Sequence, residues 1–256
     1  MSLRARSRQQ LGYPNNKGRR ENAMTVLERL ADFAGGAMLD TARVTEVSRL
    51  SDDFVRVELA ADTFRKATWV PGAKLQFRPR RGTLSLRTYT PVSWDVERGV
   101  TELVGFTHGD GPAAHWLRQV TAGDACEVFG PRRSIDLRDP AGSTVFVGDE
   151  SSVALACALR TVTADVSHVF EGRDPAGLTE VLTGLGINAQ VVEKTSDRAE
   201  LLSRAREAAG AAPGSLVVTG DAATVHAVRR DIRTWPQAPR EVKGKAYWAE
   251  GRTGLD

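Results

Sequence analysis

The residues that most strongly predict the fold are Ser85-Leu86-Arg87-Thr88-Tyr89-Thr90-Pro91-Val92. They carry a guanidinium, a phenol and a hydroxyl along one short strand. We expect that strand to end at Pro91, because a residue before proline is held extended and cannot enter a helix. A planar guanidinium matches a phosphate through paired charge-assisted hydrogen bonds, so Arg87 is a candidate phosphate ligand. Tyr89 and Thr90 are candidates for contacts to a planar ring and to its polar edge.

One predicted strand later comes Phe106-Thr107-His108-Gly109-Asp110-Gly111-Pro112-Ala113-Ala114-His115-Trp116. Its glycines lead into a helix, since proline suits the first helical position. The free amides of such a helix start bind a pyrophosphate, and small side chains let the phosphate approach closely. We expect the Asp110 side chain to cap the helix. His108 is either a ring contact or a loop histidine with an ordinary hydrogen bond.

Each segment alone is weak evidence, because most Arg-x-Tyr-Thr strands are surface strands and most glycine-rich helix starts are turns. Together, and in this order, they predict a flavin dinucleotide site. The residues expected to form it are Arg87, Tyr89, Thr90, His108, Gly109, Gly111, Ala113 and Ala114.

The combination resembles the siderophore-interacting proteins, FAD-dependent ferric-siderophore reductases of the ferredoxin-reductase superfamily. The resemblance extends from about Thr41 to the C-terminus and also takes in Gly123-Asp124, Gly130-Pro131, Val147-Gly148-Asp149-Glu150 and Tyr247-Trp248. It implies FAD as cofactor, NAD(P)H or ferredoxin as electron donor, and a ferric siderophore as acceptor. It thins at two positions where many members carry a basic residue and this chain has Val92 and Ala249. Thr90-Pro91-Val92-Ser93 looks closer to the cytochrome b5 reductase branch.

Composition and charge exclude several classes of protein. The 256 residues suffice for two modest domains without cross-links, and two cysteines, Cys126 and Cys157, lie in apolar contexts typical of buried thiols. Residues 1–20 hold six basic residues and no acid, whereas the whole chain has a net charge of +3, so the remainder carries −3. A basic tail on a mildly acidic body does not predict a nucleic-acid-binding fold. No apolar run is long enough to span a bilayer and none forms a secretory signal, so we expect a cytoplasmic protein.

Hydrophobic periodicity divides the chain into three parts. Residues 1–23 are expected to be a disordered basic tail. Residues 24–140 begin with a short helix and continue with six predicted strands, near 42–47, 54–59, 75–77, 84–90, 100–106 and 126–129, with one helix between the last two. Period-two runs bounded by turns are typical of antiparallel strands, so this part is predicted to be a closed β-barrel that binds FAD.

Residues 141–256 alternate strands and helices. Strands are expected at 144–147, 166–170, 189–193, 215–219 and 245–248, and helices near 152–162, 175–184, 197–209 and 222–234. Such alternation predicts an α/β doubly wound parallel sheet that binds NAD(P)H. Gly148-Asp149 and Gly220-Asp221 each end a strand and begin a helix, so both turns are expected at the carboxyl edge of the sheet, where ligands bind.

The turn Gly148-Asp149-Glu150-Ser151 is the candidate nucleotide contact of this second part, with Ser151 or Ser152 as N-cap. No Gly-x-Gly-x-x-Gly occurs, so nicotinamide binding is implied mainly by the family resemblance. In Glu171-Gly172-Arg173 the glutamate suits the ribose diol of NADH, whereas Arg173 suits the extra phosphate of NADPH. Trp248 is either an aromatic contact to the flavin or nicotinamide, or part of a buried last strand.

The resulting hypothesis is an FAD-dependent, NAD(P)H-dependent reductase of ferric siderophores that releases ferrous iron. No catalytic side chain is assigned, because the flavin performs the electron chemistry, and no histidine spacing indicates a metal site. Arg252, Lys243 or Lys245 are candidates for attracting an anionic chelate. Two alternatives remain: an electron-transfer flavoprotein serving another acceptor, and a flavin- or siderophore-binding module without turnover. The siderophore, the donor and the oligomeric state stay open.

Overall fold

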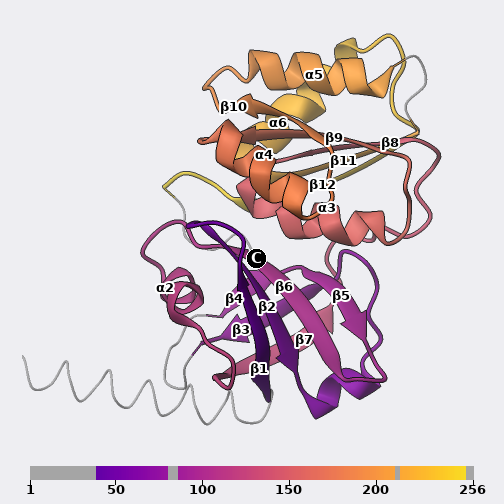
Figure 1. Ribbon diagram of the computed structural model, residues 1–256. Helices are drawn as coiled ribbons and strands as arrows, with labels where there is room; N and C mark the ends of the chain where they lie inside the picture. The colour runs from indigo at the N-terminus through magenta and orange to yellow at the C-terminus, as the bar shows by residue number, and fades with distance from the viewer. Residues whose placement is uncertain (1–38, 80–85, 211–213, 252–256) are drawn as a thin grey trace, which may run out of the picture.

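The computed structural model describes residues 39–79, 86–210 and 214–251. These residues form two sheets, a seven-stranded antiparallel one followed by a five-stranded parallel one (Figure 1). The predicted two-domain fold class is therefore confirmed. The predicted basic tail and leading helix lie outside the described residues, as do Leu84 and Ser85 of the predicted strand 84–90.

The antiparallel sheet has the order β4-β3-β7-β1-β2-β6-β5. Its first and last members, β4 and β5, are consecutive in the chain with only Thr90 between them, so the sheet curls until its edges meet there. Alternate side chains along the strands, such as Val55, Val57 and Leu59, are buried inside. The strands are β1 (Asp40–Arg49), β2 (Phe54–Ala60), β3 (Lys74–Arg78), β4 (Arg87–Tyr89), β5 (Pro91–Asp95), β6 (Val100–Phe106) and β7 (Ala125–Arg132).

The prediction of six strands is wrong by one, because β5 was missed. Pro91 does end β4, but it also begins β5, which pairs with β6. A proline is tolerated at the first position of a strand, where its missing N–H need not join the ladder. The change of direction at Thr90 and Pro91 places Thr90 at a corner of the barrel.

One helix, α2 (Pro112–Gln119), covers one end of the barrel as predicted, and a short 3₁₀ turn, η1 (Asp62–Lys66), follows β2. The α2 side chains Ala113 and Leu117 are buried in the barrel core. Gly105 on β6 is required for this packing, since a Cβ there would lie 2.6 Å from the Leu117 side chain.

The parallel sheet has the order β10-β9-β8-β11-β12. Helices cover both faces: residues of α3 and α4 share a core with Phe146, Phe170 and Val217, whereas residues of α5 and α6 pack on Val145 and its neighbours. The elements are β8 (Thr144–Gly148), η2 (Glu150–Ser152), α3 (Val153–Arg160), β9 (Val166–Gly172), α4 (Pro175–Gly184), β10 (Ala189–Glu193), α5 (Ala199–Ala209), β11 (Ser215–Asp221), α6 (Ala222–Asp231), η3 (Ile232–Thr234) and β12 (Glu241–Trp248).

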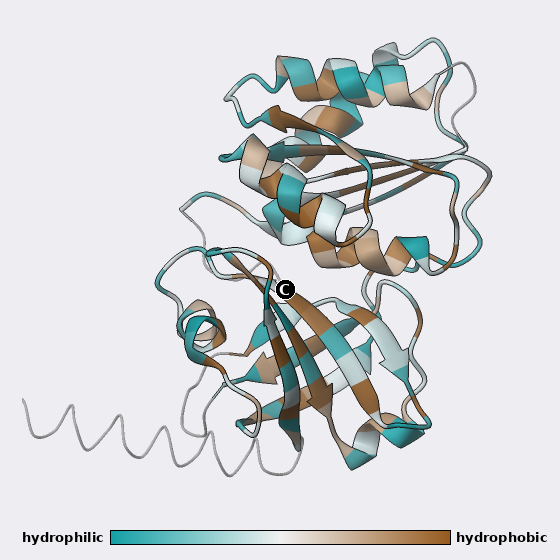
Figure 2. Cartoon of the chain, viewed as in Figure 1, coloured by the Kyte–Doolittle hydropathy of each residue, from teal (hydrophilic) through white to brown (hydrophobic). Residues whose placement is uncertain are grey.

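Helix α3 lies between the two sheets and joins their cores. Its residues from Val153 to Leu159 are all buried, and they share one apolar cluster with Phe54 and Val104 of the barrel. Figure 2 shows this apolar helix between the two layers of strands. A continuous apolar interface of this kind resists separation of the domains.

The segment that joins the domains is fixed by a turn before β3. The N–H of Ile135 donates to the carbonyl of Gly72 at 3.2 Å, and the N–H of Leu137 donates to that of Pro71 at 3.2 Å. Gly72 has a φ of +88°, and a Cβ there would lie 2.0 Å from the Ile135 oxygen.

Replacing Gly72 with alanine is expected to lower the free energy of unfolding by about 2 kcal/mol, because a positive φ and a backbone clash are combined at one site. Gly123→Ala is the matched control, since Gly123 also has a positive φ, +96°, but open space around its Cβ position. Urea unfolding of both variants separates the clash from the backbone effect. Equal losses in the two variants would show that the contact with Ile135 contributes nothing.

Both cysteines are buried and unbonded, as predicted. Burial raises the pKa of the Cys126 thiol to about 12 and that of Cys157 to about 11, so neither is a reactive thiolate. Among the described residues, no helix combines the length and the apolar character that crossing a bilayer requires.

Candidate functional site

A cavity of about 500 Å³ lies between the barrel and the carboxyl edge of the parallel sheet. Its position follows from the topology, because the β4–β5 corner of the barrel faces the ends of the parallel strands, where ligands bind in open α/β sheets. The barrel contributes Lys74, Leu86, Arg87, Thr88, Tyr89, Thr90, Val104, Phe106, His108 and Ser134, and the second domain contributes Glu150, Ser151, Ala154, Arg173, Lys194, Tyr247 and Trp248.

The three candidate ligands of the first motif, Arg87, Tyr89 and Thr90, all line this cavity. Arg87 is half-buried and donates to the Leu86 carbonyl at 3.1 Å, and within the described chain it forms no ion pair. Its guanidinium therefore keeps donors for a ligand. The Tyr89 ring also packs edge-on against Phe77 of the barrel core, with ring centroids 5.5 Å apart. Burial raises the pKa of the Tyr89 phenol, which stays protonated.

His108 lines the cavity and bridges the two domains. Its ring stacks on Phe106 at 5.5 Å between centroids, and its Nε2 lies 2.8 Å from Nη1 of Arg173. Arginine can only donate, so His108 accepts through Nε2. Glu150 accepts the backbone N–H of Arg173 at 2.8 Å, and burial raises the pKa of the Glu150 carboxyl. The loops after β6, β8 and β9 are thus joined at the cavity rim.

The start of α2 lies outside the set of residues that line the cavity. Gly109 and Gly111 have open space around them, whereas the side chains of Ala113 and Ala114 are buried in the barrel. The predicted Asp110 cap is wrong: the N-cap is Gly111, and no side chain caps the helix. Asp110 precedes the N-cap by one residue and cannot serve as it. The first amides of α2 are consequently free of a side-chain acceptor.

The turn after β8 divides into two parts. Glu150 and Ser151 line the cavity, whereas Gly148 and Asp149 are buried behind its wall. A Cβ at Gly148 would lie 2.6 Å from the Ser152 side chain, so this glycine serves packing. Ser152 is the N-cap residue of α3, as one of the two expected alternatives, but its side chain makes no capping hydrogen bond. Asp149 caps the preceding turn η2, where its side chain accepts the Ser151 N–H at 3.0 Å. Neither Gly148 nor Asp149 therefore lines the cavity.

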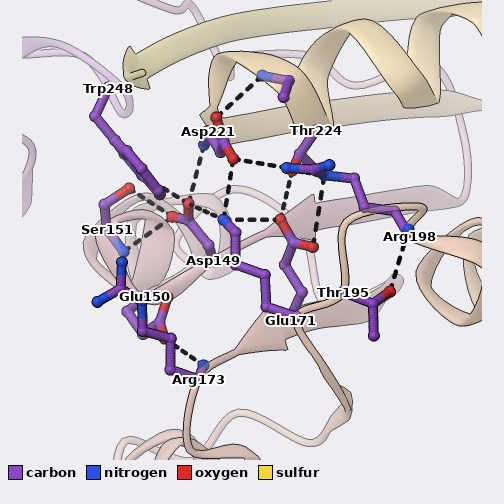
Figure 3. Close-up of polar contacts among 12 residues, drawn as sticks. Asp149, Glu150, Ser151, Glu171, Arg173, Thr195, Arg198, Asp221, Thr224 and Trp248 are labelled. Carbon is purple, nitrogen blue, oxygen red and sulfur yellow. Dashed lines mark hydrogen bonds and ion pairs between the residues drawn. The ribbon is translucent and has the colours of Figure 1, made fainter. Parts of the chain in front are cut away.

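Behind the wall, the ends of all five parallel strands meet in one buried cluster (Figure 3). The Lys194 ammonium lies 3.2 Å from both Glu171 and Asp221 and 3.8 Å from Asp149. Arg198 donates to Asp221 at 2.7 Å. As expected, the two Gly-Asp turns are adjacent, and the Asp221 N–H donates to Asp149 at 2.9 Å. With three carboxylates and two cations, the cluster has a net charge of −1.

The two aromatic residues of β12 line the cavity in front of this cluster. The Trp248 indole N–H donates to Asp149 at 2.8 Å, and its ring lies 4.5 Å from the Lys194 ammonium. Burial raises the pKa of the Tyr247 phenol to about 12, and the hydroxyls of Thr90 and Thr219 oppose that rise. Tyr247 therefore stays neutral between the barrel and the second domain.

The lining suits an anionic ligand with a planar ring. The charged lining residues are one carboxylate, Glu150, and four cations, Lys74, Arg87, Arg173 and Lys194, of which Lys194 is already paired with the carboxylates behind the wall. Tyr89, Phe106 and Trp248 supply flat apolar surface. A dinucleotide with a pyrophosphate and an aromatic ring matches both properties.

Sequence reasoning missed Lys194 and Arg198 entirely. They follow an ordinary edge strand, and only the convergence of the parallel strand ends brings Lys194 to the cavity and both cations to the acidic turns. A lysine directly after a predicted strand, at the edge where the Gly-Asp turns were expected, was the one available signal.

Comparison with known proteins agrees with this geometry. Residues 39–135 match the family model described as a siderophore-interacting FAD-binding domain, and residues 141–251 match the model described as siderophore-interacting protein. A curated relative, the NADPH-dependent ferric-chelate reductase of Escherichia coli strain K12, is 28% identical in a 171-residue alignment that covers 63% of this chain and 65% of that protein. The aligned region thus spans slightly less than two thirds of that relative.

Solved structures share the fold. A siderophore utilization protein from T. fusca superposes with a TM-score of 0.68 at 22% identity, covering 85% of this chain and 95% of that one. The siderophore-interacting protein SipS from Aeromonas hydrophila gives 0.66 at 19% identity, covering 84% and 93%. Two consecutive family models, an FAD-binding barrel and a parallel nucleotide-binding sheet in the same order lead to one conclusion: the chain belongs to the siderophore-interacting protein family.

Proposed function

We propose that this protein is an FAD-dependent reductase that takes electrons from NAD(P)H and delivers them to ferric siderophores, from which ferrous iron is released. The observation that carries the proposal is the single cavity that joins Arg87, Tyr89 and Thr90 of the barrel to Glu150, Ser151 and Trp248 of the second domain. The name of the curated relative, an NADPH-dependent ferric-chelate reductase, supports the same reaction.

The barrel residues would hold the FAD. Arg87 binds a phosphate with its free guanidinium donors, Tyr89 packs on the ring or ribityl chain, and Thr90 offers its hydroxyl to the polar edge of the ring. The uncapped amides after Gly111, those of Ala113 and Ala114, are suited to the pyrophosphate, with Gly109 allowing the chain to turn there. His108, the residue before Gly109, lies on the cavity rim. When bound, FAD accepts electrons as a pair and passes them on singly.

For the donor, the geometry favours NADPH over NADH. Glu171 is fully buried, and its carboxylate is held by Lys194, Arg198 and the hydroxyl of Thr224. It is therefore not free to bind a ribose diol. Arg173 lies on the cavity rim with its guanidinium exposed, where it can bind an additional phosphate.

Replacing Arg173 with leucine is expected to raise the KM for NADPH about 10- to 100-fold and to change the KM for NADH less than twofold, because a lost contact to a charged group costs about 1.5–3 kcal/mol. Steady-state kinetics with both donors measures the two effects. Arg160→Leu is the control, since this exposed arginine donates to the Leu185 carbonyl far along α3. Equal increases for NADH and NADPH would contradict a role in phosphate recognition.

The acceptor needs no protein ligand to its iron, because electrons can pass to a ferric chelate without a bond to the metal. Two chelates accept one electron each for every NADPH oxidised, and one proton is released. Among the predicted basic residues, Lys245 donates to Ser134 of the cavity rim at 3.0 Å, and Lys243 lies 3.3 Å from Glu241. This position near the cavity supports a role of Lys245 in attracting an anionic chelate. Arg252 lies outside the described residues.

A visible spectrum recorded before and after NADPH addition without oxygen tests the proposal. FAD-loaded protein should bleach with NADPH, and ferric siderophore should restore the oxidised spectrum. If a cytochrome, ferredoxin or quinone restores the spectrum and ferric siderophore does not, the protein is an electron-transfer flavoprotein for another acceptor. If neither NADPH, NADH nor reduced ferredoxin bleaches the bound FAD, the protein is a binding module without turnover.

A further inference from the structure

Trp248 and Lys194 come from opposite edges of the parallel sheet and meet over its centre. Lys194 directly follows the edge strand β10, and Trp248 ends the other edge strand, β12. The ammonium lies 4.5 Å from the centroid of the indole ring, which is within the range of a cation–π contact. Figure 3 shows the indole extending toward Asp149.

Asp149 gives this arrangement a fixed point. Its carboxylate is almost fully buried, and besides the Trp248 N–H it accepts the N–H groups of Ser151 and Asp221 and both serine hydroxyls of the turn, Ser151 at 2.5 Å and Ser152 at 3.3 Å. A carboxylate held by so many donors does not rotate freely. The indole N–H is therefore hydrogen-bonded to a carboxylate that is itself held in place, so a movement of the ring would break this bond.

We propose that Lys194 and Asp149 are positioning residues for Trp248. Asp149 fixes the ring by its N–H edge, and Lys194 fixes one face of the ring. A planar ring in the cavity then stacks on Trp248 only from the face that the ammonium leaves open. The identity of that planar ring, flavin or nicotinamide, rests on the proposed function; the orientation of Trp248 does not.

The orientation is tested on the protein without nucleotide, labelled with 5-fluorotryptophan. The chain has five tryptophans, and Trp248→Phe identifies the fluorine resonance of Trp248. Lys194→Met should shift or broaden this resonance and leave the other four in place, because only Trp248 loses its cation. Lys66→Met, an exposed lysine on η1, is the control and should move none. An unchanged Trp248 resonance in Lys194→Met would overturn the proposal.

Lys194→Arg keeps the proposal testable if Lys194→Met does not fold. Arginine retains the positive charge, so the protein should fold with one sharp Trp248 resonance. That resonance should still be displaced from its native position, since a different cation lies on the ring. A Trp248 resonance identical to that of the native protein would contradict the contact.

The effect on turnover is measured with FAD, NADPH and a ferric chelate. Lys194→Met should lower kcat about 10-fold, because a small displacement of a group near the reacting atoms can lower the rate by this much or more. Lys194→Arg should recover most of the lost kcat. In a Trp248→Leu background, where no ring remains to be positioned, Lys194→Met should cause no further loss. Equal losses in both backgrounds would show that Lys194 does not act through Trp248. If neither the native protein nor any variant reduces the chelate, the proposed function fails. The fluorine spectra still decide whether Lys194 positions Trp248.

Discussion

Replacing Lys194 with methionine is expected to lower the free energy of unfolding by about 3–5 kcal/mol at neutral pH, since removing one partner of a buried ionic cluster has an effect of this size. Lys194 is 14% exposed and lies within 4 Å of Asp149, Glu171 and Asp221. Without its charge, Arg198 would be the remaining cation of the cluster, in contact with Glu171 and Asp221, and the net charge of the cluster would change from −1 to −2. Urea unfolding at neutral pH measures the loss.

The loss should depend on pH in a defined direction. Burial alone would raise the pKa of Asp221, but the Ala223 N–H and the charges of Lys194 and Arg198 outweigh burial and hold the pKa below its usual value. A carboxyl whose pKa is lower in the folded state stabilises the fold above its unfolded pKa, about 4, and loses that contribution as the pH falls through the folded value. Lys194 supplies part of that contribution. The difference in the free energy of unfolding between the native protein and Lys194→Met should therefore narrow below about pH 4.

Two controls separate this electrostatic effect from a general loss of packing. Lys66→Met removes an exposed lysine and should change stability by less than about 0.5 kcal/mol. Lys194→Arg keeps the charge and should recover most of the stability. If Lys194→Met lost as much unfolding free energy at pH 3.5 as at pH 7, the loss would come from poor packing of the methionine and not from the unpaired carboxylates.

Replacing Arg87 with alanine is expected to weaken FAD binding about 10- to 100-fold, because one or more charge-assisted hydrogen bonds of about 1.5–3 kcal/mol would be lost. Arg87 lines the cavity and forms no ion pair within the described chain, so its donors are not required by the fold. Stability without FAD should accordingly change little. Quenching of flavin fluorescence during titration with FAD gives the dissociation constant.

The chemistry of the guanidinium can be separated from its charge. Arg87→Lys retains a positive charge but lacks the planar fork, so its affinity for FAD should lie between those of the native protein and Arg87→Ala. Arg98→Ala removes an arginine that is 64% exposed in the turn between β5 and β6 and does not line the cavity, and it should bind FAD normally. An unchanged FAD affinity in Arg87→Ala would refute the phosphate contact.

Much of the fold was predictable because it depends on local patterns. The segments predicted for β6, β10 and α4 agree with the structure residue for residue, since runs of alternating or helically spaced apolar residues end there at clear turn signals. Strand β5 was missed because Pro91 was interpreted only as the end of β4. Whether a proline ends a strand or begins the next depends on the strand that pairs with it, here β6.

The candidate site was predictable where one segment supplies it whole. Arg87, Tyr89 and Thr90 are nearly adjacent in sequence, and the corner at Pro91 brings all three to the cavity. The Asp110 cap was predicted wrongly because capping depends on the residue at which a helix begins, and helix boundaries are the least certain part of a pattern. The role of Glu171 likewise depended on burial that its neighbours in sequence do not reveal.

By itself, the sequence determined the order of the domains, the class of each sheet and the strand that is proposed to bind flavin, because these follow from periodicity and from motifs whose residues are close in the chain. Only the tertiary structure decided which polar residues face the cavity and which serve the fold. Lys194, Asp149 and Trp248 lie on three different strand ends, and they become neighbours only because parallel strands bring their carboxyl ends to one edge. Contacts of this kind have no period in the sequence, since they depend on the packing of the whole sheet.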